Sequence, residues 1–108
     1  MKYLLLIADD PTTPGEDQLP EYVKFTEGIV ASGEMRGGDR LHGVDSATSV
    51  RVRNGRTVAT DGPFAETKEQ LGGYYIVDVA DLDRALELAA QIPAARTGVV
   101  EVRPIWDM

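Results

Sequence analysis

A small α+β fold is predicted for this chain by three features of its sequence. Runs in which apolar residues recur at every second position are typical of strands, and they alternate with two stretches of helical periodicity. The length of 108 residues suits one domain. No linker, internal repeat or low-complexity tract interrupts the chain. We therefore predict a single domain over residues 1–108 that is built from one sheet and two helices.

The first two elements are a buried strand and an amphipathic helix. The run Tyr3–Ile7 is apolar on both alternating faces, which is typical of a central strand covered on both sides. A helix is predicted over Asp17–Ser32, and Gly33 is placed to end it in the left-handed conformation. The residues predicted to form its inner stripe are Leu19, Tyr22, Val23, Thr26 and Val30.

The middle of the chain predicts a β-hairpin over Thr48–Asp61. Asn54-Gly55 is a strong type I′ turn signal between two β-prone runs. The two-residue loop places one set of side chains on a polar face, namely Arg51, Arg53 and Arg56. The other, more apolar face carries Thr48, Val50, Val52, Thr57 and Ala59, and Asp61 continues it. Before the hairpin, Gly37-Gly38 is expected to break the chain and Arg40–His42 to form a short strand.

The last elements are a strand, a helix and a strand. The strand is predicted over Tyr74–Val79, after which Asp81 caps a helix that Pro93 stops. The apolar stripe of this helix is predicted to be Leu82, Ala85, Leu86 and Ala89. Val99–Ile105 is the final strand. Without the hairpin, the order is βαββαβ, so the predicted fold is a ferredoxin-like sandwich with an inserted β-hairpin.

A homodimer is predicted because two helices cover only one face of a four-stranded sheet. The strands Tyr3–Ile7 and Tyr74–Val79 are apolar on both faces, so the second face needs another cover. The hairpin supplies part of that cover in this interpretation, and a second copy packed sheet to sheet supplies the rest.

The composition excludes several classes of function. A net charge of −7 disfavours nucleic acid and anionic membranes as partners. The chain has no cysteine and one histidine, so no metal set is expected. No glycine-rich phosphate loop or dinucleotide fingerprint is present, so no cofactor is expected. The apolar start, Met1–Asp10, is short and ends in two aspartates, which favours a strand in a cytoplasmic protein over a signal peptide.

A family resemblance rests on the segment Asp61–Tyr75, which reads DGPFAETKEQLGGYY. With its flanks Arg40–His42 and Val100–Ile105, this segment resembles the signature of the DGPF-motif branch of the YCII-related proteins. The resemblance implies a dimeric ferredoxin-like α+β barrel and an active site built on a histidine and an aspartate. It also implies diverse functions, since one relative is a dehydrochlorinase of chloroaromatic breakdown and others are associated with alternative sigma factors.

The catalytic pair that best matches this pattern is His42 with Asp61. His42 is the only histidine, and its side chain suits proton transfer near neutral pH. A surface or strand-capping histidine is the alternative interpretation. Asp61 before Gly62-Pro63 suits a turn whose carboxylate accepts backbone N–H groups, and it equally suits a carboxylate that orients an imidazole.

Further residues are candidates for substrate binding. Lys68 and Glu66 belong to a charged run that is either a solvated loop or a lid over a pocket. Phe64 is a packing anchor or a substrate contact. Glu101 and Arg103 share one strand face, where they form an exposed pair or, in a dimer barrel, Arg103 clamps a carboxylate.

Two functions therefore stay open from the sequence. The first is a cofactor-independent enzyme that moves a proton on a small anionic or aromatic substrate, in an elimination or isomerisation. The second is a binding dimer without chemistry, holding a metabolite or serving as an accessory to an alternative sigma factor. The enzyme requires the candidate residues to converge on one pocket, whereas the binding dimer does not.

Overall fold

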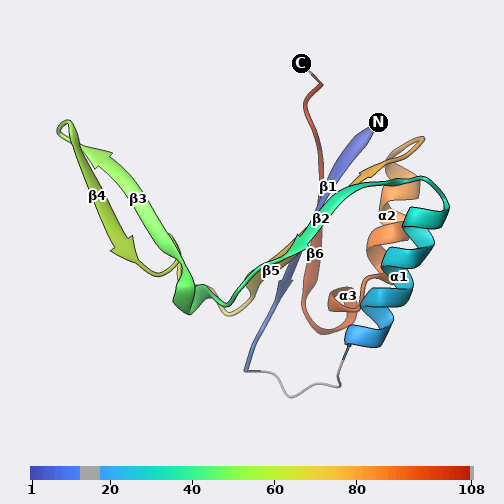
Figure 1. Cartoon of the computed structure of the whole chain (residues 1–108), viewed down its shortest axis with the longest axis horizontal. Coiled ribbons are helices and arrows are strands. Elements are labelled where there is room, and N and C mark those ends of the chain that lie inside the picture. Colours follow the sequence, from blue (N-terminus) through green and yellow to red (C-terminus); the bar gives the residue numbers. More distant parts are fainter. Residues whose placement is uncertain (13–17, 108) are drawn as a thin grey trace.

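The protein folds as a mixed α+β structure with two antiparallel sheets, seen in a computed structural model that describes residues 1–12 and 18–107 (Figure 1). Four strands form the main sheet in the order β2-β5-β1-β6, and β3 and β4 form a separate pair. The strands are β1 (Lys2–Asp9), β2 (Met35–Arg40), β3 (Thr48–Arg53), β4 (Arg56–Asp61), β5 (Gln70–Asp78) and β6 (Val99–Pro104). The helices are α1 (Leu19–Ala31), α2 (Leu82–Gln91) and the short α3 (Ala94–Thr97), with a 3₁₀ turn, η1 (Val44–Ser46), before β3.

The central strand β1 divides the sheet into two faces. Tyr3, Leu5 and Ile7 are buried against the helices, while Leu4 and Leu6 point to the other face and are half-buried. β1 pairs antiparallel with β5 on one side and with β6 on the other. The core on the helical face comprises Tyr3, Leu5, Ile7, Phe25, Ile29, Tyr75, Val77, Val79, Ala85, Leu88, Ala89, Ile92 and Ala94.

The buried stripe of α1 differs from the predicted one. Phe25 and Ile29 are the buried residues of this helix, whereas Val23 and Val30 are exposed. Phe25 meets the ring of Tyr75 edge-on at a centroid distance of 5.2 Å, so this contact with the sheet selects the helix rotation. The predicted first residue, Asp17, lies outside the described residues. Gly33 follows the helix with φ +80, as predicted for its terminator.

The second helix begins as predicted but also buries a different stripe. The Asp81 carboxylate accepts a hydrogen bond from the Arg84 backbone N–H at 3.0 Å and caps α2. The buried residues are Ala85, Leu88 and Ala89, while Leu86 is exposed. The helix ends at Gln91, and Pro93 then leads into α3 rather than directly into the last strand.

The second strand was predicted at the wrong residues. β2 spans Met35–Arg40, including the glycine pair that was expected to break the chain, and His42 lies beyond it. The glycines permit close packing: a Cβ on Gly38 would lie 2.9 Å from the Tyr75 ring and 3.0 Å from the Tyr74 carbonyl oxygen. A register shift between Met35 and Gly37 marks a bulge in the same strand.

The β3–β4 hairpin, called the arm below (Thr48–Asp61), projects from the body of the molecule (Figure 1). Its register is the predicted one, with Val50 opposite Ala59 and Val52 opposite Thr57. Asn54 and Gly55 both have positive φ, as a type I′ turn requires. Every residue from 50 to 61 is exposed, so the arm has no cover within the protomer.

The helices lie on one side of the main sheet, and the arm extends away from the sheet on the other side (Figure 1). This uncovered face carries Leu4 opposite Ile76 and Leu6 opposite Tyr74. No described helix is both long and apolar enough to span a bilayer.

Candidate functional site

A cavity of about 700 Å³, called the α1 cavity below, lies between α1 and the adjoining ends of β1, β2 and β5. Its volume lies within the range of small-molecule sites, roughly 300–1,000 Å³. The lining residues are Ile7, Asp9, Gln18, Leu19, Tyr22, Val23, Thr26, Glu27, Met35, Gly38, Asp39, Arg40, Gly72, Gly73, Tyr74 and Tyr75. Two apolar side chains that α1 does not bury in the core, Leu19 and Val23, therefore form part of a cavity wall.

Two tyrosines bring hydroxyl groups to the α1 cavity. Burial raises the pKa of the Tyr22 phenol, and nearby Asp9 and Tyr75 add to this rise, while the Ala94 backbone and Arg40 oppose it. Tyr22 therefore stays protonated at neutral pH and can donate a hydrogen bond. The Tyr75 hydroxyl is bonded to the Thr26 hydroxyl at 2.7 Å, which ties β5 to α1.

Opposite charges flank these hydroxyls. The Asp9 carboxylate at the end of β1 accepts hydrogen bonds from the Thr97 hydroxyl at 2.7 Å and from the Asp10 backbone N–H at 2.9 Å, so its position is fixed. The Arg40 guanidinium at the end of β2 forms no hydrogen bond or ion pair with any residue in 1–12 or 18–107. Among the described residues, Arg40 is thus a cation at the cavity without a bonded partner.

The Tyr74 side chain lies on the other face of the sheet, beside Leu6, and its hydroxyl already has a partner. The Tyr74 hydroxyl donates to the Asp39 carboxylate at 2.6 Å, and this bond raises the pKa of Tyr74. The pair joins β5 to β2 beside Gly73, where an added Cβ would lie 2.9 Å from the Asp39 carbonyl oxygen. Close packing of β2 against β5 therefore fixes the strand ends that border the α1 cavity.

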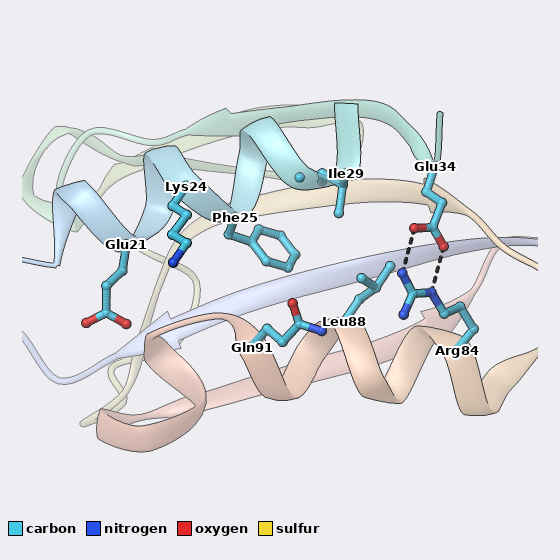
Figure 2. A pocket seen from close by; sticks show the side chains of 9 residues that line it. Glu21, Lys24, Phe25, Ile29, Glu34, Arg84, Leu88 and Gln91 are labelled. Atoms are coloured by element: carbon cyan, nitrogen blue, oxygen red, sulfur yellow. Dashed lines mark hydrogen bonds and ion pairs between the residues drawn. The ribbon is translucent and has the colours of Figure 1, made fainter. Parts of the chain in front are cut away.

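A smaller groove of about 440 Å³ separates α1 from α2 (Figure 2). Phe25, Ile29 and Leu88 line it. At one end, Glu34 and Arg84 form a bidentate pair with both N–O distances at 2.8 Å. Because these charges satisfy each other, this groove offers less to a charged ligand than the α1 cavity does.

The Glu34–Arg84 pair makes stability depend on pH. Hydrogen bonds from Arg84 and Ser32 lower the pKa of Glu34 from 4.5 to about 2. A depressed carboxyl pKa stabilises the fold above the unfolded-state pKa, and this contribution is lost as the pH falls towards 2. We expect Glu34→Gln to lower the free energy of unfolding by about 1 kcal/mol at pH 7, because the pair is partly exposed.

Urea unfolding at several pH values tests this expectation. The difference between the wild type and Glu34→Gln should shrink from pH 5 to pH 2. Glu87→Gln is the matched control, since Glu87 binds the same arginine at 3.0 Å but is 64% exposed, and it should have the smaller effect. A Glu34→Gln deficit that is equally large at pH 2 and pH 7 would contradict the pairing.

The sequence-predicted pair, His42 and Asp61, lies near the base of the arm. His42 follows β2 and Asp61 ends β4, and both are exposed. Within the part of the chain that the structure describes, no hydrogen bond or ion pair joins them. The turn after Asp61 is held instead by backbone groups: the Gly62 N–H donates to the Ala47 carbonyl at 2.7 Å.

The predicted substrate-binding residues are also dispersed. Phe64, Glu66 and Lys68 lie in the exposed loop between β4 and β5, and Phe64 is 83% exposed. Glu101 and Arg103 form an ion pair at 3.6 Å on β6, on the uncovered face of the sheet. None of these residues lines the α1 cavity or the groove between the helices. The fold of the chain thus does not bring the sequence-predicted site together.

Sequence reasoning missed Tyr22, Arg40 and Asp9 as site residues. Tyr22 was assigned to the core stripe, and Arg40 was read only as the start of a short strand. One available indication was the surplus of apolar residues on α1, which is more than one buried stripe needs. An arginine beside a pair of glycines at a strand end was another, since glycines leave room for a ligand.

A comparison with models of protein families shows which family this chain belongs to. The model for the YCII-related domain matches residues 1–108. The chain belongs to the YCII-related family. No group of three metal-binding side chains gathers anywhere in the described part of this YCII-related chain.

Two individual comparisons accompany the family match. Uncharacterized protein R00369 of Rhizobium meliloti (strain 1021) is 45% identical over 78 residues, which are 70% of this YCII-related chain and 63% of that protein's length. The solved structure of 5-chloro-2-hydroxyhydroquinone dehydrochlorinase (TftG) from Burkholderia phenoliruptrix AC1100, in complex with 2,5-dihydroxybenzoquinone, gives a TM-score of 0.49 at 15% identity. That comparison covers 99% of this chain and 94% of the other. A likeness of this degree carries no functional argument.

Proposed function

We propose that this YCII-related protein binds a small organic anion with an apolar or aromatic body in the α1 cavity. The observation that carries the proposal is the Arg40 guanidinium, which bonds to no group in residues 1–12 or 18–107, at a cavity of about 700 Å³ with largely apolar walls. An anionic group would pair with Arg40, and the protonated Tyr22 phenol would donate a second hydrogen bond. Leu19, Val23 and Met35 would contact the body of the ligand.

Chemical-shift mapping with aromatic carboxylates, beginning with salicylate, tests the proposal. Shifts are expected at the backbone amides of Tyr22, Gly73 and Tyr74. Arg40→Gln should weaken binding about tenfold, because it removes a charge-assisted hydrogen bond. Arg103→Gln is the matched control and should leave the affinity unchanged, since Arg103 lies on the other sheet face. The proposal would be contradicted by chemical-shift changes that cluster at His42 and Asp61, or by an unchanged affinity of Arg40→Gln for salicylate.

The assignment within the family is also a proposal. The segment Asp61–Tyr75 supports the DGPF-motif branch. The sheet order β2-β5-β1-β6, with both longer helices on one face, supports the ferredoxin-like arrangement over one domain of 108 residues. The uncovered sheet face supports a homodimer. The cytoplasmic location stays a prediction from composition.

A proton-transfer enzyme is the second candidate, and one observation favours it. Arg40 lines the α1 cavity, and His42 follows it by two residues, so the histidine is carried by the same strand end as the cavity's cation. In this proposal His42 moves a proton on the bound ligand and Asp61 orients the imidazole.

Turnover separates this enzyme from a non-catalytic binding dimer. For a substrate found by the mapping, His42→Gln should reduce turnover by about 10²–10⁴-fold, the range typical of acid–base groups, with Asp61→Asn reducing it less. Asp45→Asn, an exposed carboxylate in η1, serves as the control. Unchanged turnover in His42→Gln would exclude His42 from the reaction.

A further inference from the structure

The α1 cavity holds a carboxylate as well as a cation. Asp9, at the end of β1, lines the cavity and is half-buried. Its Oδ1 accepts the Asp10 backbone N–H at 2.9 Å, and its Oδ2 accepts the Thr97 hydroxyl at 2.7 Å. An ionised carboxylate has about four acceptor sites, so each oxygen keeps a lone pair for a further donor. An anion bound at Arg40 makes no use of this acceptor.

Residues of α3 and of the start of α1 hold this carboxylate in place. Thr97 ends α3, which lies beside the first turn of α1 (Figure 1). The Thr97 hydroxyl donates to Asp9 and accepts from the Gln18 side-chain amide at 3.5 Å. One residue earlier, Arg96 binds both carboxylate oxygens of Glu21, at 2.9 and 2.8 Å. Asp9 is therefore positioned before a ligand arrives, which lowers the entropic cost of using it.

Asp9 and Arg40 reach the cavity from opposite sides of β5. Gly73 on β5 pairs with Ile7 of β1 on one side and with Arg40 of β2 on the other. The two outer strands are thus two strand spacings apart, about 10 Å. Asp9 lies two residues beyond Ile7, and Gly73 adds no side chain to the sheet surface at this point, so a flat group can lie on the backbone.

The Tyr22 phenol lies in the field of both charges. Burial raises the pKa of Tyr22, Asp9 adds to this rise, and Arg40 opposes it. The cation and the carboxylate are therefore close enough to act on one small ligand. A ligand with an anionic group at both ends would be repelled by Asp9, whereas one with a hydrogen-bond donor at the far end would be attracted.

A hydroxyl group suits the Asp9 end of the cavity better than an ammonium group does. An ammonium group carries three donors and a full charge. Burying it beside apolar side chains such as Ile7 and Val23 costs free energy unless every donor is paired. A hydroxyl group needs one acceptor, and Asp9 supplies it.

We propose that the ligand of the α1 cavity is a hydroxylated organic acid whose hydroxyl lies at the opposite end from its carboxylate, and that Asp9 accepts the hydrogen bond of this hydroxyl. Thr97 acts on the ligand through Asp9 and is a positioning residue. This inference rests on the proposed function and adds the second polar group of the ligand to it.

Matched aromatic acids test the hydroxyl preference in calorimetric titrations at pH 7. The acid para-hydroxybenzoate should bind about tenfold more tightly than benzoate, because it gains a charge-assisted hydrogen bond. Salicylate should stay within about threefold of benzoate, since its hydroxyl lies beside its own carboxylate. Equal affinities for benzoate and para-hydroxybenzoate would overturn the proposal. Tighter binding of para-(aminomethyl)benzoate than of para-hydroxybenzoate would also overturn it, in favour of an ammonium ligand.

Substitution of Asp9 separates the loss of this bond from a distorted cavity. Asp9→Asn should weaken para-hydroxybenzoate binding about tenfold and leave benzoate binding at least as tight as in the wild type, because a repelling charge is removed. An equal loss for both ligands would overturn the proposal.

Thr97→Val should reduce the preference for para-hydroxybenzoate over benzoate about threefold, because Asp9 loses its tether. Thr60→Val, on the exposed strand β4, is the matched control and should keep the wild-type preference. An unchanged preference in Thr97→Val would overturn the positioning role of Thr97.

The benzoate titration distinguishes failure of this inference from failure of the proposed function. If benzoate does not bind, or binds Arg40→Gln as tightly as the wild type, the proposed function fails and this inference fails with it. If benzoate binding depends on Arg40 but the para-hydroxyl brings no gain in affinity, only the role of Asp9 is overturned.

Discussion

Leu88→Ala is expected to lower the free energy of unfolding by about 3 kcal/mol, the typical loss for a fully buried leucine. Leu88 on α2 is 2% exposed and lines the groove between α1 and α2 together with Phe25 and Ile29 of α1 (Figure 2). Truncation removes apolar contacts and leaves a cavity that the sheet cannot fill. In a domain of this size, the melting temperature should fall on the order of 15 °C.

The same helix supplies the control for this prediction. Leu86 is 47% exposed, so Leu86→Ala should change stability by no more than about 0.5 kcal/mol. Urea unfolding followed by circular dichroism measures both variants. Equal losses in the two variants would mean that α2 is rotated from the orientation described above.

Gly98→Ala should cost about 3 kcal/mol through overpacking. Gly98 lies between α3 and β6, and a Cβ there would collide with the Ala8 carbonyl oxygen and lie 2.9 Å from the Asp9 Cα. Both obstacles are backbone atoms, so no side-chain rotation relieves them. Because Asp9 lines the α1 cavity, the displacement should also weaken ligand binding.

Gly28→Ala is the matched glycine control. Gly28 lies within α1, and a Cβ at this position would meet nothing within 4 Å. Alanine has the higher helix propensity, so this variant should gain about 0.5–1 kcal/mol. In thermal unfolding, the melting temperature should fall for Gly98→Ala and rise for Gly28→Ala. A stable Gly98→Ala protein with unmoved Asp9 resonances would show that the end of β1 is looser than its contacts indicate.

The strands were more predictable than the rotation of the helices. The alternation of side chains in Tyr3–Ile7 determines which of them face the helices, because a strand has only two faces. The Asn54-Gly55 turn determines the register of the hairpin, because a two-residue type I′ turn allows only one pairing of its strands. On α1, by contrast, apolar residues occur around much of the helix. The edge contact of Phe25 with Tyr75 decides which of them are buried, and that contact joins residues far apart in the sequence.

The candidate site was less predictable than the fold. A lone histidine and an aspartate drew attention by residue type, yet the protomer does not bring His42 and Asp61 into contact. The α1 cavity is formed where α1, β1, β2 and β5 do not pack fully against one another. No local sequence pattern predicts such a gap in tertiary packing. Arg40 became a candidate only once β2 was seen to end at that residue, beside α1.

The position of β1 in the sheet also governs the order in which the protein can fold. This strand is synthesised before the other strands of the sheet, yet its neighbours are β5, over Gln70–Asp78, and β6, over Val99–Pro104. Either pairing closes a long loop of chain, and the entropy lost in closing this loop must be offset by the contacts that the pairing forms. Such non-local contacts slow folding. Until residue 104 has emerged, the apolar run Tyr3–Ile7 lacks half of its partners. The main sheet can therefore be completed only after β6 has been synthesised, because β6 is the second neighbour of β1.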